Sequence, residues 1–243
     1  MTLVLAGVDG CPGGWIAVLR SQDSAATAHA VFCPAFRDIL DLAPAPGIIA
    51  VDMPIGLPER GGIGGRQADI EARANLGYRQ SAVFAVPARA AVMETDYRAA
   101  CDAALRASDP PRKVSKQTFN IFPKIRELDA LMTPALQDRV VECHPEVAFW
   151  ALNGATPLDL PKKVKSRAHP PGLALRRGLL ESAGYPAALF ERHPWPLSVA
   201  GPDDLLDAAV NSWSAARIAR GEARRFPADP PRDGRGLRME IFG

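Results

Sequence analysis

The sequence predicts an α/β fold, with a mixed five-stranded sheet flanked by helices and a mainly helical insertion. Short apolar runs of strand length recur at residues 3–8, 15–19, 48–51 and 139–142. Only a turn rich in Gly and Pro separates the first two runs, whereas segments with helical spacing separate the later ones. This order is typical of a sheet that starts with antiparallel strands and continues with parallel strands joined by helices.

The N-terminal part of the sequence predicts three strands, a short helix and a fourth strand. Residues 3–8 form an apolar run that Asp9 ends, and residues 11–14 supply turn chemistry before the run at 15–19. Larger residues alternate with alanines at 27–32, which predicts a weaker third strand. Apolar residues at 36–40 have helical spacing. The next buried strand ends at Asp52, because Pro54 has no N–H with which to continue a ladder.

The stretch from about residue 59 to 133 does not resemble a single crossover between strands. It holds three segments with helical spacing, separated by joints rich in Gly and Pro, at residues 67–76, 96–107 and 116–132. We therefore predict one domain over residues 1–243 that carries a helical insertion at about 59–133.

The C-terminal part predicts one more buried strand and three helices. The apolar run at 139–142 ends in Glu142, and Pro145 then stands at a first-turn position of a helix that reaches about residue 152. Helical spacing continues at 171–183 and is clearest at 203–220, where Gly221 ends the helix. Apolar residues alternate with charged residues at 237–241, which predicts a last edge strand.

Composition excludes several classes of protein. The chain has 243 residues, of which 47% are hydrophobic and 23% charged, so a disordered or collagen-like chain is excluded. The formal net charge is only +2, which excludes a strong overall field for nucleic acid or membranes. The four cysteines have no C-x-x-C spacing, and no apolar stretch is long enough to span a bilayer. We expect a soluble, cytoplasmic protein with reduced thiols, and we leave a homo-oligomer open.

Carboxylates recur where the predicted strands end. Asp9, Asp52 and Glu142 each follow a separate buried run, and ligands gather at the carboxyl ends of strands in open α/β sheets. Asp204 and Asp207 are three residues apart, so they share one face of the C-terminal helix. A group of four or five carboxylates suits the hard cations Mg²⁺ or Mn²⁺, and two such ions are an apparatus for attack on a phosphodiester.

Each acid also has a purely structural interpretation. Asp9 and Asp52 suit turns, Glu142 suits an ion pair with a lysine, and Asp203 suits a helix cap, which is the role we expect for it. Taken together, acids after three buried strands and Asp207 inside a helix favour a functional cluster. His144 either ligates a metal or is hydrogen-bonded in the structure, Glu146 has a secondary role, and Cys11 is a packed thiol.

Several motifs resemble those of the domain of unknown function 429 family. They are GVDGCPGGW at 7–15, VDMPIGLP at 51–58, LGYRQSAVF at 76–84, SKQ at 115–117, KIRELD at 124–129, ECHPE at 142–146 and DLLDAA at 204–209. The family is described as predicted nucleases with an RNase H-like fold, and the last motif is similar to the C-terminal helix of Holliday-junction resolvases. The resemblance implies Asp9, Asp52 and Asp207 as core metal ligands, with Asp204 and Glu142 in support.

Basic residues suggest where a phosphate would be held. Residues 162–177 contain six Lys or Arg and no acid, which suits either a phosphate backbone or a solvated surface. Arg79, Lys116 and Lys124 lie within the family-like motifs, and we predict that they contact substrate phosphates.

The function expected from these observations is Mg²⁺- or Mn²⁺-dependent hydrolysis of a phosphodiester in nucleic acid or a nucleotide, without a membrane partner. A phosphate-binding ATPase or kinase of the actin-like type is the alternative, because residues 9–14 could wrap phosphates. That class usually needs two such domains, and this chain has one set of motifs. A non-catalytic binding module on the same fold is the third interpretation.

Overall fold

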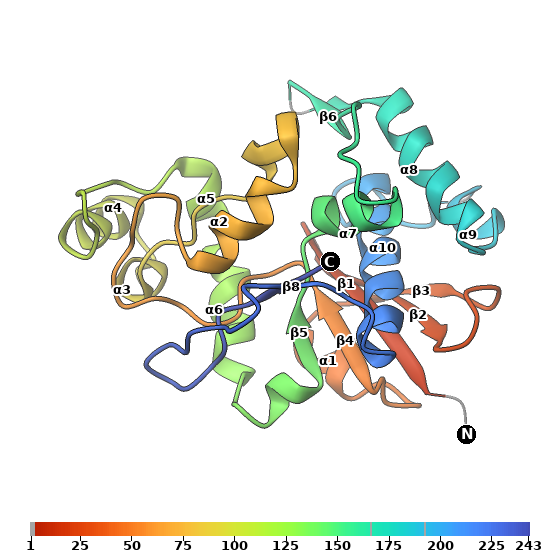
Figure 1. The fold of residues 1–243 in the computed structure, drawn as a ribbon, viewed down its shortest axis with the longest axis horizontal. Helices are drawn as coiled ribbons and strands as arrows, with labels where there is room; N and C mark the ends of the chain where they lie inside the picture. Colours follow the sequence, from red (N-terminus) through yellow and green to blue (C-terminus); the bar gives the residue numbers. More distant parts are fainter. Residues whose placement is uncertain (1–2, 166, 192) are drawn as a thin grey trace.

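The computed structural model describes residues 3–243 except 166 and 192, and its centre is a five-stranded sheet (Figure 1). The strand order is β3-β2-β1-β4-β5. These strands are β1 (Val4–Cys11), β2 (Gly14–Ser21), β3 (His29–Cys33), β4 (Ile48–Val51) and β5 (Val140–Glu142). The pairs β1–β2 and β2–β3 are antiparallel, whereas β1–β4 and β4–β5 are parallel. The predicted mixed α/β sheet is therefore confirmed.

The β1–β2 hairpin is longer than the apolar runs that predicted it. Asp9 pairs with Ile16, and the ladder continues to the pair of Cys11 with Gly14. The prediction that Asp9 ends its strand is therefore wrong: the tight turn lies at residues 12–13, and β1 continues for two residues beyond Asp9. Asp9 consequently has the fixed side-chain direction of a strand residue.

A short helix α1 (Phe36–Leu40) joins β3 to β4, and further helices fill the stretch between β4 and β5. The latter are α2 (Gln67–Ala74), η1 (Gly77–Ala82), α3 (Arg89–Val92), α4 (Tyr97–Arg106), α5 (Lys116–Asn120), α6 (Phe122–Leu131) and η2 (Leu136–Asp138). The single helix predicted at 116–132 is two, because Ile121 ends α5 and precedes α6, with a proline in its first turn. Figure 1 shows α2 to α5 on one side of the sheet.

The chain after β5 returns to the sheet through helices and adds two small two-stranded sheets. In order, the elements are α7 (Pro145–Leu152), β6 (Lys163–Val164), β7 (Arg167–Ala168), α8 (Pro170–Ser182), α9 (Ala188–Glu191), α10 (Pro202–Ala219), β8 (Arg225–Phe226) and β9 (Ile241–Phe242). The strand predicted at 237–241 is only the two residues of β9, which pair with β8 and touch the main sheet by one bridge, Cys143 to Phe242.

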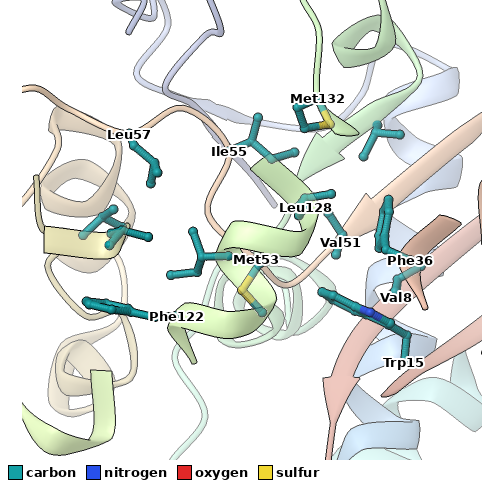
Figure 2. Packing of buried hydrophobic residues seen from close by; sticks show 14 of the residues in the cluster. Val8, Trp15, Phe36, Val51, Met53, Ile55, Leu57, Phe122, Leu128 and Met132 are labelled. Carbon is teal, nitrogen blue, oxygen red and sulfur yellow. The ribbon is translucent and has the colours of Figure 1, made fainter. Parts of the chain in front are cut away.

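Alternation along the strands divides the core between the two faces of the sheet. Val8, Trp15 and Val51 point to the face that α1 and α6 cover, where they meet Phe36 and Leu128 (Figure 2). Leu5, Ile16 and Ala50 point to the opposite face, which packs against α7, α8 and α10. Because side chains alternate, Asp9 and Asp52 must share the second face, the one under α10.

Among the described residues, no helix combines the length and the apolar character that a membrane crossing requires. The 18-residue helix α10 carries three aspartates in its first two turns.

Candidate active site

Asp9 and Asp52 lie side by side because of strand register. Val8 of β1 is opposite Val51 of β4, so the residues that follow them are also neighbours. The Asp52 N–H donates to the Val8 carbonyl at 2.9 Å, which continues the parallel ladder past the end of β4. Both carboxylates project toward α10, since they follow residues that face the other side.

The helix α10 brings Asp207 to this pair by an unusually close approach to β1. A Cβ atom at Gly7 would lie 1.9 Å from the Ser212 backbone nitrogen and 2.1 Å from the Ala208 carbonyl oxygen. Only glycine therefore lets the helix backbone rest on the strand. The Asn211 side-chain amide donates to the Val8 carbonyl at 3.1 Å and fixes the helix along the strand. Asp207, one turn before Asn211, is thereby held over the end of β1.

Asp9, Asp52 and Asp207, which we call the carboxylate triad, line one cleft of about 760 Å³. Asp203 and Asp204 lie on the same wall. The predicted convergence of strand-end and helix carboxylates is thus present for four of the five proposed acids. The cleft wall also includes the side chains Cys11, Arg79, Lys124, His144, Glu146, Lys162 and Lys163.

The triad is poorly neutralised by the described part of the protein. Neither the Asp9 nor the Asp52 side chain accepts a hydrogen bond from a described residue, and only Lys162 bonds Asp207, through Oδ2. Burial, followed by the charges of Asp52 and Asp207, raises the pKa of Asp9 well above its usual range. Burial also raises the pKa of Asp52, and it raises the pKa of Asp207 to about 7 despite the Lys162 ammonium.

These raised pKa values predict that metal-free protein loses stability as the pH rises. The folded triad holds protons more tightly than the unfolded chain. Its contribution to the free energy of unfolding is therefore fully present below the unfolded pKa of 3.8 and is lost as the pH rises toward about 7. We expect the free energy of unfolding in EDTA to fall by at least about 1.4 kcal/mol between pH 5.5 and 8, the equivalent of one pKa unit. Urea unfolding at pH 5.5 and at pH 8 measures this difference in stability.

Asp9→Asn is the control for that pH dependence. The variant cannot ionise at position 9, so its loss of stability between pH 5.5 and 8 should be smaller than that of the wild type. Equal slopes for the two proteins would contradict the assignment of the pH effect to the triad. Addition of Mn²⁺ should flatten the wild-type slope, because a cation favours the ionised carboxylates.

Asp203 and Asp204 have structural partners at the start of α10. The Gly201 N–H donates to Asp204 Oδ2 at 2.7 Å, so this carboxylate caps the helix, and its residue is only partly exposed in the cleft. Asp203 forms an ion pair of 2.6 Å with Lys163. Asp203 thus has a structural partner, but the capping role expected for it is wrong: Asp204 caps the helix and keeps one oxygen for a supporting role.

Glu142 belongs to a separate buried ion cluster rather than to the triad. Its Oε1 and Oε2 accept hydrogen bonds from Arg66 at 2.6 and 2.8 Å, and Oε2 also accepts the Ile55 N–H at 2.7 Å. Asp69 binds the same guanidinium at 2.7 Å. Because both Glu142 oxygens are engaged, we correct the expectation that Glu142 completes a metal shell. It holds the loop that follows Asp52 in place.

His144 and Glu146 are both occupied by structural contacts. The Glu146 N–H donates to His144 Nδ1 at 3.2 Å, which makes His144 the cap of α7 and leaves the ring proton on Nε2, 3.2 Å from the Ala82 carbonyl oxygen. Glu146 accepts from Arg176 at 2.6 Å, and Arg79 lies 3.5 Å from its other oxygen. Of the two interpretations of His144, the structure favours the hydrogen-bonded one.

The three predicted phosphate contacts have different surroundings. Arg79 and Lys124 line the cleft, and the Lys124 ammonium donates to the Gly14 carbonyl at 2.6 Å and lies over the Trp15 ring. Lys116 instead stacks on Tyr97, with 4.4 Å between its nitrogen and the ring centre, and it is not part of the cleft wall. The structure thus places Arg79 and Lys124, but not Lys116, in the cleft that the triad lines.

Much of the basic segment 162–177 is neutralised by acids of the same chain. Lys162 bonds Asp207, Lys163 bonds Asp203, Arg176 bonds Glu146 and Arg177 bonds Glu181. The segment is therefore mainly a set of intramolecular ion pairs rather than an unbroken phosphate-binding surface. Sequence reasoning placed Lys162 only in this segment and missed its contact with the triad, because its partner lies 45 positions away in the chain.

The triad has the right chemistry for a hard divalent cation. Its groups are carboxylates on three different elements, and Asp207 Oδ1 is buried without a hydrogen-bond partner in the described structure. Among the residues described, no three acidic, histidine or cysteine side chains are already close enough to form a complete metal site. A cation at the triad would therefore require the carboxylate side chains to move closer together.

The chain matches the model of one protein family, described as "Protein of unknown function (DUF429)", over residues 7–232. Since the match covers nearly the whole chain, the protein belongs to this family. No curated protein matches the chain, and no solved structure matches it either.

Proposed function

We propose that this member of the DUF429 family is a metal-dependent phosphodiester hydrolase that acts on nucleic acid or a nucleotide. The carboxylate triad carries the proposal, because β1, β4 and α10 hold three carboxylates in one cleft with a single ammonium to neutralise them. Such an arrangement costs stability unless a cation joins it. The strand order β3-β2-β1-β4-β5, with β2 antiparallel to its neighbours, supports the RNase H-like part of the proposal.

Asp9, Asp52 and Asp207 would hold Mg²⁺ or Mn²⁺, with Asp204 in support. When bound, the ion supplies an activated water and charge neutralisation at the phosphoryl group. Asp9 and Asp52, which have no competing hydrogen bonds from described residues, offer the least encumbered oxygens. Arg79 lines the same cleft, and a guanidinium suits the non-bridging oxygens of a phosphate.

The side chains of the cleft do not favour a covalent mechanism. Burial raises the pKa of the Cys11 thiol, so little of the reactive thiolate is present at neutral pH. His144 uses its two ring nitrogens in hydrogen bonds to the backbone and is therefore not free to act as the base for a nearby hydroxyl. Attack by water is thus the chemistry that these residues support best.

The turn between β1 and β2 does not favour the alternative of an actin-like ATPase. In that alternative, backbone N–H groups of residues 9–14 would wrap phosphates. The Gly13 N–H instead donates to the Val199 carbonyl at 2.9 Å, and a Cβ at Gly13 would meet Val199 at 3.1 Å. The turn is therefore already covered by the segment that leads into α10.

The test is cleavage of a panel of substrates by the wild-type chain. Single-stranded, duplex and branched DNA and RNA, together with a small aryl phosphodiester, are incubated with Mg²⁺, Mn²⁺ or EDTA. We expect cleavage of at least one substrate with Mn²⁺ or Mg²⁺ and none in EDTA. Absence of cleavage throughout the panel would overturn the proposal, and ATP binding in the same preparation would then favour the actin-like alternative.

A further inference from the structure

The contact between Lys162 and Asp207 is unlike the other ion pairs in the cleft. Lys162 precedes β6, and its ammonium reaches across to the buried Asp207 on α10 while most of its own side chain is shielded. The Lys162 charge also interacts with the charges of Asp9 and Asp52, the other two members of the triad. The ammonium is therefore within the field of all three carboxylates rather than paired with one of them.

The remaining cations of the cleft are engaged elsewhere. Lys124 donates to the Gly14 carbonyl at 2.6 Å, Lys163 pairs with Asp203 at 2.6 Å, and Arg79 lies 3.5 Å from Glu146. Lys162 is thus the cation that belongs to the triad. When all three carboxylates are ionised, as a bound cation favours, they and one ammonium leave two negative charges in a largely buried site.

One carboxylate oxygen of the triad lacks a partner among the described residues. Asp207 is 1% exposed, and while Lys162 bonds its Oδ2, its Oδ1 is buried and has no hydrogen-bond partner among the described residues. A carboxylate that is held on one oxygen by an ammonium can still offer the other oxygen to a metal ion. Such an unsatisfied buried acceptor is costly unless a partner is supplied.

We propose that the Lys162 ammonium is a resident second cation of the carboxylate triad, so that the cleft takes one divalent ion and not two. One divalent ion balances the two negative charges that the ionised triad and Lys162 leave, whereas two ions would leave an excess of two positive charges on the same three ligands. This inference rests on the proposed function for the presence of a metal, and it replaces the two-ion arrangement expected from the sequence.

The number of ions that bind tests the inference without any assay of cleavage. Mn²⁺ is titrated by calorimetry and electron paramagnetic resonance into wild type, Lys162→Met and Lys163→Met at constant pH. We expect one Mn²⁺ per wild-type chain and at least about tenfold tighter binding of the first ion by Lys162→Met, because a repelling charge has been removed. Lys163→Met, which removes the adjacent lysine that pairs with Asp203 rather than with the triad, should change the affinity for the first ion less than Lys162→Met does.

Stability in EDTA gives a second, independent measurement. Without Lys162 the triad has no cation, so Lys162→Met should unfold at lower temperature than Lys163→Met in EDTA at pH 8, and Mn²⁺ should reverse the loss. Lys162→Gln keeps a hydrogen-bond donor without the charge and should behave like Lys162→Met. Recovery of wild-type behaviour by Lys162→Gln would show that only the hydrogen bond matters and would overturn the inference.

The two proposals fail in different ways. Two Mn²⁺ ions in the wild type, or an unchanged affinity in Lys162→Met, would overturn the inference about Lys162 even if the chain cleaves a phosphodiester. One Mn²⁺ in the wild type, together with tighter binding by Lys162→Met, would uphold the inference about Lys162. If no substrate in the panel is then cleaved, only the proposed hydrolase activity is overturned.

Discussion

Asp9→Asn is expected to lower metal-dependent cleavage by about a hundredfold or more, since even changes in the outer shell of a metal site cost 10- to 100-fold. Asp9 neighbours Asp52, which directly follows the adjacent strand β4, and it interacts with the charge of Asp207 on α10. The substitution keeps the shape of the side chain and removes one negative charge. The affinity for Mn²⁺ and kcat/KM should therefore fall together, whereas binding of nucleic acid in EDTA should persist, because the basic residues remain.

Asp203→Asn is the matched control for Asp9→Asn. It removes the same charge from the same wall of the cleft, but Asp203 is paired with Lys163 at the start of α10. This variant should keep its turnover within a few-fold of the wild type. If Asp9→Asn cleaves as fast as the wild type, or if the two variants lose activity equally, the triad is not the catalytic centre.

Arg66→Met is expected to lower the free energy of unfolding by about 3–5 kcal/mol, the usual cost of removing one partner of a buried ion pair. Arg66 is almost completely buried, and its guanidinium binds Asp69 at 2.7 Å and Glu142 at 2.6 Å. It also donates to the Ile55 carbonyl at 3.0 Å. Methionine leaves two buried carboxylates without their cation. Urea unfolding followed by circular dichroism measures the loss.

Two further variants make the prediction for Arg66 specific. Arg98→Met on the exposed side of α4 changes the same charge outside any described ion pair and should alter stability by less than about 0.5 kcal/mol. Adding Glu142→Gln to Arg66→Met removes one stranded charge and should recover part of the loss. A loss below about 1 kcal/mol in Arg66→Met would contradict the importance of the cluster.

The central sheet could be predicted from sequence because its strands are buried on both faces. Such strands are continuous apolar runs, and the runs at 3–8, 15–19, 48–51 and 139–142 correspond to β1, β2, β4 and β5. Boundaries were predicted less well. The ladder of β1 continues through Gly10 and Cys11, which are not strong strand formers, since pairing with β2 holds them.

The acids of the site could be predicted only as a group, because their partners are set by tertiary structure. Glu142 has the same sequence signature as Asp52, an acid after an apolar run. The difference is Arg66, which comes from 76 positions away and binds both Glu142 oxygens. Periodicity carries no information about such a partner. The same holds for Lys162, whose position in a basic segment resembles that of any surface lysine.

The seating of α10 on Gly7 has a consequence for the newly made chain. Val8 and Asn211, which this contact joins, are 203 positions apart, so β1 leaves the ribosome long before the helix that covers it is synthesised. Until then the sheet lacks one of its packing layers, and Asp9 and Asp52 lack their third carboxylate. An incomplete translation product that stops before α10 therefore has no assembled triad, so tests of metal binding and cleavage require a chain that extends through α10.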